Sequence, residues 1–200
     1  MTTHLLNRVF IINGAESNAI AKGDYNQMMF ELAKQFFWDK GVTVDATRVR
    51  DGYQVDMEQF KLTSADLVIF QMPIYWFNMP GMLKKYIEEV YGTGVTHGGD
   101  AAYGQAGLLT NTHYMLSTTW NAPISAFEAG GTYENLSADD ILRSAHVTQE
   151  YVGMLPLPSF HAFDILRSPD TETWKKRYFD HLEEICKASF RIISNQRSLA

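Results

Sequence analysis

The chain has 200 residues, 46% of them hydrophobic and 20% charged, and this composition excludes a disordered or fibrous protein. Its 17 Lys and Arg against 23 Asp and Glu leave a net charge of −6, so we expect no nucleic-acid partner. The single cysteine, Cys186, excludes an internal disulfide framework and a multi-cysteine metal cluster. This length predicts one domain over residues 1–200.

No segment has the pattern of a membrane span or a secretory signal. The N-terminal stretch MTTHLLNRVFIINGA lacks a basic region followed by a long apolar one. The longest apolar stretch, Leu67–Leu83, is interrupted by Gln71, Pro73, Asn78 and Pro80, which one spanning helix would not tolerate. We therefore expect a cytoplasmic protein without an integral membrane segment.

In the first half of the chain, short apolar runs alternate with helical periodicity. The run Val9–Ile12 is rich in β-branched residues and stops at Asn13-Gly14, as a buried strand does. Gly41 is placed to end the helix before it. The elements predicted after the first strand are a helix over Tyr25–Lys40, a strand over Val42–Val49, a helix over Met57–Ser64 and a strand over Asp66–Gln71.

The second half continues the alternation. Pro80 begins a helix, and Ser137-Ala138-Asp139-Asp140 resembles a capping box with Asp in place of Glu. The predicted elements are a helix over Pro80–Tyr91, a Gly-rich loop over Gly92–Gly107, a strand over Tyr114–Thr118, a helix from Ser137, a strand over Leu157–Ile165 and a helix over Asp170–Asn195.

This order predicts an α/β fold, a doubly wound five-stranded parallel sheet with helices on both faces. Ligands on such sheets bind at the carboxyl ends of the strands. Three loops at these ends are unusual in composition: Asn13–Asp24, Met72–Asn78 and Thr119–Thr132.

The first of these loops, NGAESNAIAKGD, leads into a helix whose free N–H groups would suit a phosphate. It has neither GxxxxGK[ST] nor GxGxxG, so neither a nucleotide-triphosphate loop nor an ordinary dinucleotide loop is indicated. A polar loop that only caps the helix fits this pattern as well.

The second loop places three consecutive aromatic residues, Tyr75, Trp76 and Phe77, between two prolines. A stiffened loop with aromatic faces suits a planar heteroaromatic ring, although packing on the core or on a partner subunit is an alternative.

In the third loop, Thr119–Pro123 offers backbone N–H groups that face the same edge, or forms a plain turn.

The other candidate side chains predict no chemistry of their own. The six histidines have no metal-ligand spacing, so we expect no metal site. Ser117 lies outside any GxSxG motif, and Cys186 has the setting of a buried structural thiol.

Four motifs in chain order resemble the NAD(P)H:quinone reductase family with a flavodoxin-like fold, particularly its bacterial modulator of drug activity B branch. They are IINGA, QMPIYWFNMPGMLKKYIEEV, YMLSTTWNAPISAF and GMLPLPSF, beginning at Ile11, Gln71, Tyr114 and Gly153. The second and third are highly specific. The resemblance implies bound FAD, NAD(P)H as co-substrate and a homodimer.

By this resemblance, three groups of residues hold the cofactor. The pyrophosphate side falls to Ala21, Lys22, Gly23, Asp24, Tyr25, Asn26, Gln27 and Met28. The isoalloxazine ring is lined by Pro73, Ile74, Tyr75, Trp76 and Phe77, and its pyrimidine edge meets backbone donors among Thr119, Trp120, Asn121 and Ala122, while Tyr103 approaches from the Gly-rich loop.

The implied reaction is two-electron hydride transfer from NAD(P)H through the flavin to a quinone-like acceptor, with Tyr75, Trp76 and Tyr133 at the reacting centre. Mammalian members have a Tyr and a His after the Thr-rich turn, whereas Glu128–Glu134 offers Tyr133 and no His. Two alternatives are a flavin-binding ancillary subunit of a potassium-efflux transporter and an FMN enzyme such as an azoreductase.

Overall fold

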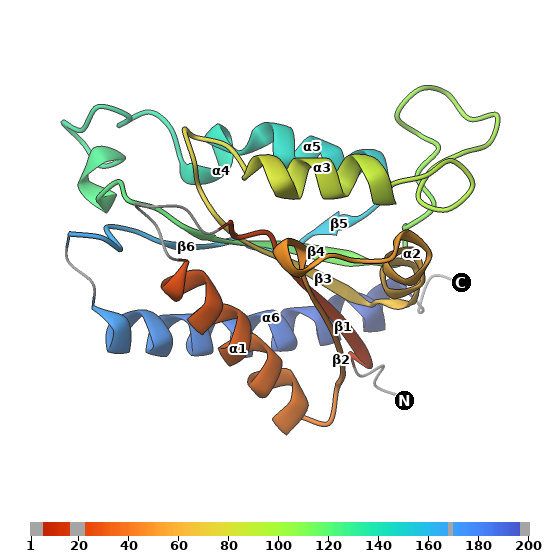
Figure 1. Ribbon diagram of the computed structural model, residues 1–200, viewed down its shortest axis with the longest axis horizontal. Coiled ribbons are helices and arrows are strands. Elements are labelled where there is room, and N and C mark those ends of the chain that lie inside the picture. The colour runs from red at the N-terminus through yellow and green to blue at the C-terminus, as the bar shows by residue number, and fades with distance from the viewer. Residues whose placement is uncertain (1–5, 17–22, 168–169, 197–200) are drawn as a thin grey trace.

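The computed structural model, which describes residues 6–16, 23–167 and 170–196, is built around one parallel sheet (Figure 1). The strand order is β2-β1-β3-β4-β5, and β6 also pairs with β4. The strands are β1 Arg8–Asn13, β2 Thr43–Arg48, β3 Leu67–Pro73, β4 His113–Thr119, β5 Leu155–Pro156 and β6 Phe160–Ala162. The predicted doubly wound parallel sheet is confirmed.

The predicted fifth strand, Leu157–Ile165, is wrong in its bounds. The structure has two short strands instead: β5 pairs with the start of β4 and β6 with its end, both in parallel. Pro156 and Pro158 have no N–H to donate, and this limits a continuous ladder along the segment. The division leaves His161 of β6 beside Thr118 of β4.

Helices cover both faces of the sheet. In Figure 1, α1 and α6 lie on one face, and α3, α4 and α5 lie on the other. The helices are α1 Asp24–Asp39, α2 Val55–Ser64, α3 Gly81–Val90, α4 Ala138–Ile141, α5 Arg143–Tyr151 and α6 Thr171–Gln196, with two short 3-10 helices, η1 Val49–Asp51 and η2 Ile124–Ala126. The predicted capping box at Ser137 and Asp140 is present.

The apolar runs of the central strands fill two cores. In β1, Val9 and Ile11 pack in the cluster with α1 and α6, whereas Phe10 and Ile12 pack in the cluster with α2 and α3. Because successive side chains of a strand point to opposite faces, a strand covered on both sides is apolar at every position. This is why β1 and β3 read as continuous hydrophobic runs.

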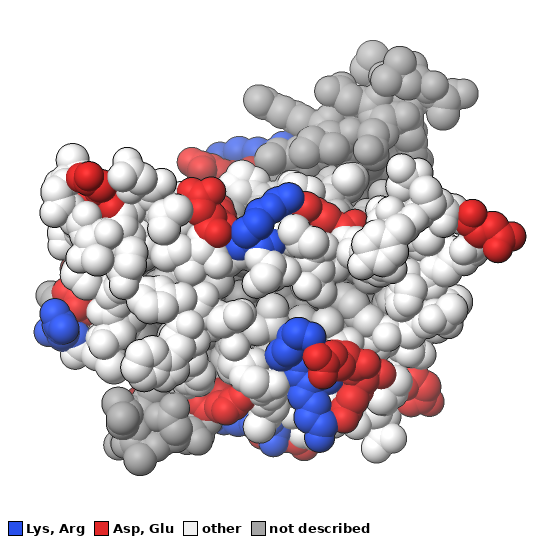
Figure 2. Space-filling view, turned by 90° about the horizontal axis from the view of Figure 1, so that it is seen from above, with Lys and Arg blue, Asp and Glu red and all other residues white. Residues whose placement is uncertain are grey.

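In Figure 2 the face above α3 and α5 shows charged side chains scattered among uncharged atoms. Ion pairs formed by side chains of α3 and α5 include Lys84 with Glu88 and Arg143 with Glu150. On this face, the described Lys and Arg side chains form no continuous basic patch. Among the described helices, none has the length and apolar character to cross a membrane.

Candidate functional site

Four buried polar side chains connect the carboxyl ends of the central strands. Ser117 donates to Gln71 at 2.7 Å, and Gln71 donates to the side-chain carbonyl of Asn26 at 2.7 Å. Asn26 in turn donates to the hydroxyl of Thr119 at 2.7 Å. Each of these polar groups therefore has a partner inside the protein, and the start of α1 is fixed against the ends of β3 and β4.

The aromatic loop after β3 is a strained two-residue turn. Tyr75 and Asn78 exchange backbone hydrogen bonds of 3.0 Å, and the residues between them, Trp76 and Phe77, have φ of 49° and 64°. Such turns favour Asn-Gly because both central residues need positive φ. Two bulky aromatic residues there cost free energy, and Trp76 is 94% exposed, so the turn presents an indole instead of burying it.

Glu16 connects this turn to the first loop and to α3. The Tyr75 hydroxyl donates to the Glu16 backbone carbonyl at 3.2 Å, and the Glu16 carboxylate accepts from the Met82 N–H at 2.6 Å, at the start of α3. Burial and the nearby Glu16 carboxylate raise the pKa of Tyr75, so this side chain stays neutral as a hydrogen-bond donor.

An aromatic row leads from the turn into the core. Tyr133 contacts Phe77 edge-to-face with ring centroids 5.4 Å apart, and Phe127 lies 5.7 Å from Tyr133. Phe127 contacts Trp120 at 5.7 Å, and Trp120 stacks on Phe163 at 5.9 Å. The structure thus brings the sequence-predicted Phe77 and Tyr133 together.

The backbone N–H of Trp120 already has a partner inside the protein. Its side chain is 2% exposed and lies in the core, and its backbone N–H donates to the Ala162 carbonyl at 2.7 Å. This N–H group extends the pairing of β4 with β6, so it has no hydrogen left for a cofactor. Ile74 is committed in the same way, because its N–H donates to the Thr119 carbonyl at 2.9 Å. Beyond Trp120, Asn121 is exposed and Ala122 partly exposed.

The first turn of α1 lies beside the first turn of α6. Ala21 and Lys22 are outside the described residues, Gly23 has φ of 79°, and Asp24 begins the helix. The Tyr25 hydroxyl lies 3.0 Å from the Thr171 hydroxyl. Gln27 and Met28, which follow Asn26, are partly buried. Far along the chain, Tyr103 is 93% exposed and its ring lies 5.5 Å from that of Tyr151.

A cavity of about 510 Å³ lies between the loop after β4, β6 and the first turns of α6. Aromatic and polar side chains share its walls, and Thr173 and Arg177 of α6 line one side. The lining residues are Pro123, Ile124, Phe160, His161, Phe163, Asp164, Asp170, Thr173, Trp174 and Arg177. The Arg177 guanidinium lies over the Trp174 ring, 5.1 Å from its centroid.

Two histidines for which the sequence predicted no chemistry share one carboxylate. The Nε2 atoms of His146 and His161 lie 3.0 and 3.1 Å from the same oxygen of Asp139. Burial opposes the charge of Asp139, but these hydrogen bonds outweigh it and hold the pKa of Asp139 well below its usual range. Spacings of 7 and 22 residues gave no local signal for this cluster. Among the described residues, no group of His, Cys, Asp or Glu has the arrangement of a metal site.

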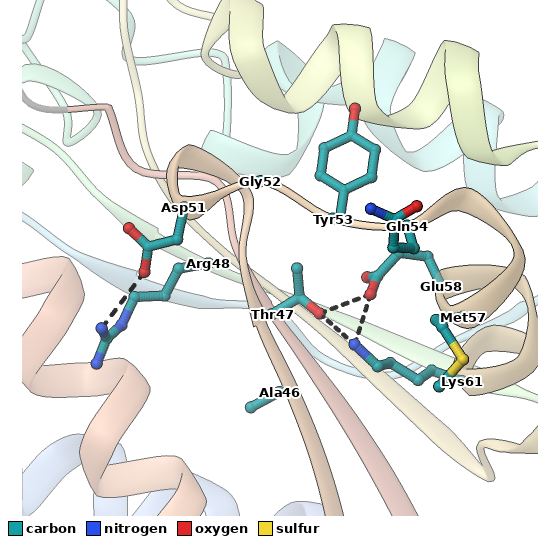
Figure 3. Close-up of a pocket in the computed structure, with 10 residues that line it drawn as sticks. All are labelled: Ala46, Thr47, Arg48, Asp51, Gly52, Tyr53, Gln54, Met57, Glu58 and Lys61. Atoms are coloured by element: carbon teal, nitrogen blue, oxygen red, sulfur yellow. Dashed lines mark hydrogen bonds and ion pairs between the residues drawn. The ribbon is translucent and has the colours of Figure 1, made fainter.

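A second hollow, of about 350 Å³, lies at the end of β2 beside α2 (Figure 3). Its buried carboxylate, Glu58, accepts from Thr47 at 3.0 Å, from Lys61 at 2.5 Å and from Tyr86 at 2.8 Å. Burial first, and then the Glu58 charge, raise the pKa of Tyr86 far above its ordinary value. These groups satisfy one another and join β2, α2 and α3, which is a structural role.

Fold and site together define an α/β protein of the flavodoxin type, with its candidate site at the strand ends beside an aromatic turn. The family model described as flavodoxin-like fold matches residues 8–185, so the chain belongs to this family. The resemblance that the four motifs predicted is confirmed.

Two relatives and one solved structure illustrate the similarity. The chain is 34% identical to the NADPH:quinone oxidoreductase MdaB of Haemophilus influenzae, over 88% of this chain and 98% of the relative. It is 34% identical to an uncharacterised protein of Schizosaccharomyces pombe, over 89% and 96%. The structure of general stress protein 14 of Treponema denticola in complex with FMN superposes with a TM-score of 0.69 at 19% identity, covering 92% of this chain and 99% of that one.

Proposed function

We propose that this protein is an FAD-dependent NAD(P)H:quinone oxidoreductase, in which nicotinamide and a quinone-like acceptor occupy one pocket in turn. The observation that carries the proposal is the strained turn that holds Trp76 and Phe77 at the end of β3, with Tyr133 against it. Backbone strain of this kind persists where function needs the geometry. The relative named NADPH:quinone oxidoreductase, which matches nearly along its whole length, supports the same activity.

Hydride uptake and release is the chemistry that a bound flavin supplies. In this proposal Pro73, Ile74 and Tyr75 lie along the ring, while Trp76 and Phe77 exclude water from the face where the acceptor stacks. Backbone groups of Asn121 and Ala122 serve the pyrimidine edge, because the Trp120 N–H is already committed. The first turn of α1, from Gly23, has N–H groups that find no acceptor within the helix itself, and these would suit the pyrophosphate.

Tyr133 is the proposed proton donor to the acceptor oxygen. The variant Tyr133→Phe keeps the ring contact with Phe77 and removes only the hydroxyl, so it should bind the flavin normally. We expect kcat to fall by at least about tenfold. This is a conservative figure, because a positioned general acid typically contributes about 100-fold or more to the rate. An unchanged kcat would assign the proton to solvent and leave Tyr133 as part of the aromatic wall.

The cavity beside α6 supports FAD in preference to FMN. Its volume of about 510 Å³ exceeds what an adenosine group needs, and Trp174 and Arg177 offer a stacking face and a cation. The contact between Tyr25 and Thr171 places it next to the first turn of α1, where the pyrophosphate is proposed. FMN has no group to fill this cavity. The FMN in the Treponema denticola structure belongs to that protein.

Extraction and mass measurement of the flavin test this choice. Trp174→Ala with Arg177→Ala should weaken FAD binding at least tenfold and leave FMN binding unchanged. The control is Lys176→Ala, because this exposed Lys176 pairs with Asp180 instead of lining the cavity. Equal FAD affinity in all variants would argue against adenosine in the cavity.

We also propose a homodimer acting in the cytoplasm, where NAD(P)H is available. An indole and a phenol ring as exposed as those of Trp76 and Tyr103 are costly to leave in water, which supports cover by a second copy. Light scattering of the holoenzyme should give twice the mass of 22.7 kDa. A monomer at micromolar concentration would contradict this.

The colour of the reconstituted protein provides the central test. The purified protein, reconstituted with FAD, should be yellow, bleach with NADH or NADPH under anaerobic conditions and recover its colour with menadione. Protein that stays colourless with both FAD and FMN would overturn the proposal. Yellow protein that neither nicotinamide reduces would favour the ancillary-subunit alternative.

A further inference from the structure

A chain of hydrogen bonds runs behind the candidate site, from Trp120 to Asp139. The indole N–H of Trp120 donates to the Thr118 hydroxyl oxygen at 2.8 Å. That oxygen lies 2.6 Å from Nδ1 of His161, whose Nε2 lies 3.1 Å from Asp139. Thr118 is buried completely, so its hydroxyl finds its partners inside the protein.

The direction of each hydrogen bond follows from the chemistry. An ionised carboxylate only accepts, so Nε2 of His161 carries the hydrogen that it donates to Asp139. In neutral His161 the other nitrogen, Nδ1, then accepts the single proton of Thr118. The hydroxyl oxygen thus keeps its lone pairs for the Trp120 indole. The other acceptor within reach of Thr118 is the Phe160 carbonyl at 3.4 Å, a much weaker partner.

We propose that His161 is a positioning residue for the candidate site, because it fixes the Thr118 hydroxyl and through it the Trp120 indole. Trp120 contacts Phe127, Phe127 contacts Tyr133, and Tyr133 contacts Phe77. The orientation of one buried indole therefore bears on both aromatic residues at the site. What these residues then do rests on the function proposed above.

The chain offers a matched control. His146 donates to the same oxygen of Asp139, but its Nδ1 lies 2.8 Å from the hydroxyl of Tyr114, near the other end of β4. A role in holding α4 through Asp139 would give both histidines similar effects. A role in positioning Trp120 belongs to His161 alone.

Two substitutions test the hydrogen bonds of the two ring nitrogens of His161 one at a time. In His161→Asn, the shorter side chain reaches the position of Nδ1 and keeps an acceptor for Thr118. In His161→Gln, the longer one reaches the position of Nε2 and keeps the donor to Asp139. The proposal expects His161→Asn to hold the Thr118 hydroxyl and the Trp120 indole as the wild type does, and His161→Gln to lose this hold.

The first measurement is solvent exchange of the Trp120 indole N–H in flavin-free protein, by ¹H–¹⁵N NMR, with Trp120→Phe to assign the signal. Trp38 and Trp76 are 70% and 94% exposed, so we expect their indole N–H groups to exchange fast. We expect exchange at Trp120 to accelerate at least about tenfold in His161→Gln, as when a buried hydrogen bond is lost, and less than twofold in His161→Asn and His146→Gln. The second is the FAD dissociation constant, which should be about tenfold higher in His161→Gln than in His161→Asn, a comparison in which both variants lack the imidazole that lines the cavity.

Slow exchange in His161→Gln, or equally fast exchange in His161→Asn, overturns the positioning role. If the His161 variants do not fold, Thr118→Ser and Thr118→Val decide: Ser keeps the hydroxyl and should match the wild type, whereas Val should not. If the wild-type protein binds no flavin while the variants still show the expected pattern of indole exchange, only the proposed function is contradicted.

Discussion

The side-chain amide of Asn26 donates to the hydroxyl of Thr119 across 2.7 Å, which joins the first turn of α1 to the last residue of β4. The carbonyl of the same amide accepts from Gln71 on β3. One buried side chain thus holds three segments in register at the edge of the sheet where the candidate site lies. Its two polar ends are used inside the protein, so its contribution to a cofactor site is to fix the backbone.

Replacing this side chain should therefore reduce stability strongly. Asn26→Ala leaves Gln71 and Thr119 without their buried partner, so we expect the free energy of unfolding to fall by about 2–3 kcal/mol. Urea unfolding followed by circular dichroism measures it. Gln35→Ala, which removes an exposed hydrogen bond to Asp39 in the same helix, should cost less than about 0.5 kcal/mol. Equal losses would show that the buried connection contributes little.

Relief of the strained turn should separate stability from activity. Asn tolerates positive φ far better than Trp, and Trp76 is exposed, so Trp76→Asn should raise the free energy of unfolding by about 0.5–1 kcal/mol. The same variant should lower kcat/KM for menadione, because the acceptor loses its stacking face. Urea unfolding and steady-state turnover test both halves. A variant that is less stable would contradict the strain argument.

Gly14 lies so close to Leu83 of α3 that a larger residue does not fit without a shift. A Cβ at this position would lie 2.7 Å from Cβ of Leu83, so α3 would have to move away from the sheet. We expect Gly14→Ala to cost about 2–3 kcal/mol of unfolding free energy, in the range of overpacked cores. Gly81→Ala is the control, because a Cβ there meets no atom closer than 4.0 Å. Similar unfolding curves for the two variants would argue against this contact.

Asp139 should make stability depend on acid pH. Its pKa is lowered in the folded protein, whereas in the unfolded chain it takes a proton near its ordinary value of 3.8. The unfolded state then binds more protons as the pH falls below about 5, so Asp139 stabilises the fold at neutral pH and loses this contribution toward pH 2. Wild type should exceed Asp139→Asn in stability at pH 7, with the gap closing through pH 4. Parallel curves from pH 7 to pH 2 would refute this.

Local patterns in the sequence were enough to predict the layers of the fold. The apolar runs at Val9 and Leu67 became central strands, and Gly41, with φ of 74°, follows the end of α1 as a C-terminal capping glycine does. Strand ends and the aromatic loop could be located because they follow from neighbouring residues. The division of the last strand was missed, since pairing of both pieces with β4 depends on residues about 40 positions apart.

The sequence by itself determined the parallel sheet, the three loops at its carboxyl edge and the family. Only the tertiary structure decided which polar atoms at that edge are already used: the Trp120 N–H by Ala162, the Asn26 amide by Thr119, and His161 by Asp139 and Thr118. The physical reason is the separation along the chain over which each kind of interaction acts. Periodicity and turn chemistry act between neighbours in the chain, whereas the partner of a buried donor is set by which strands lie side by side.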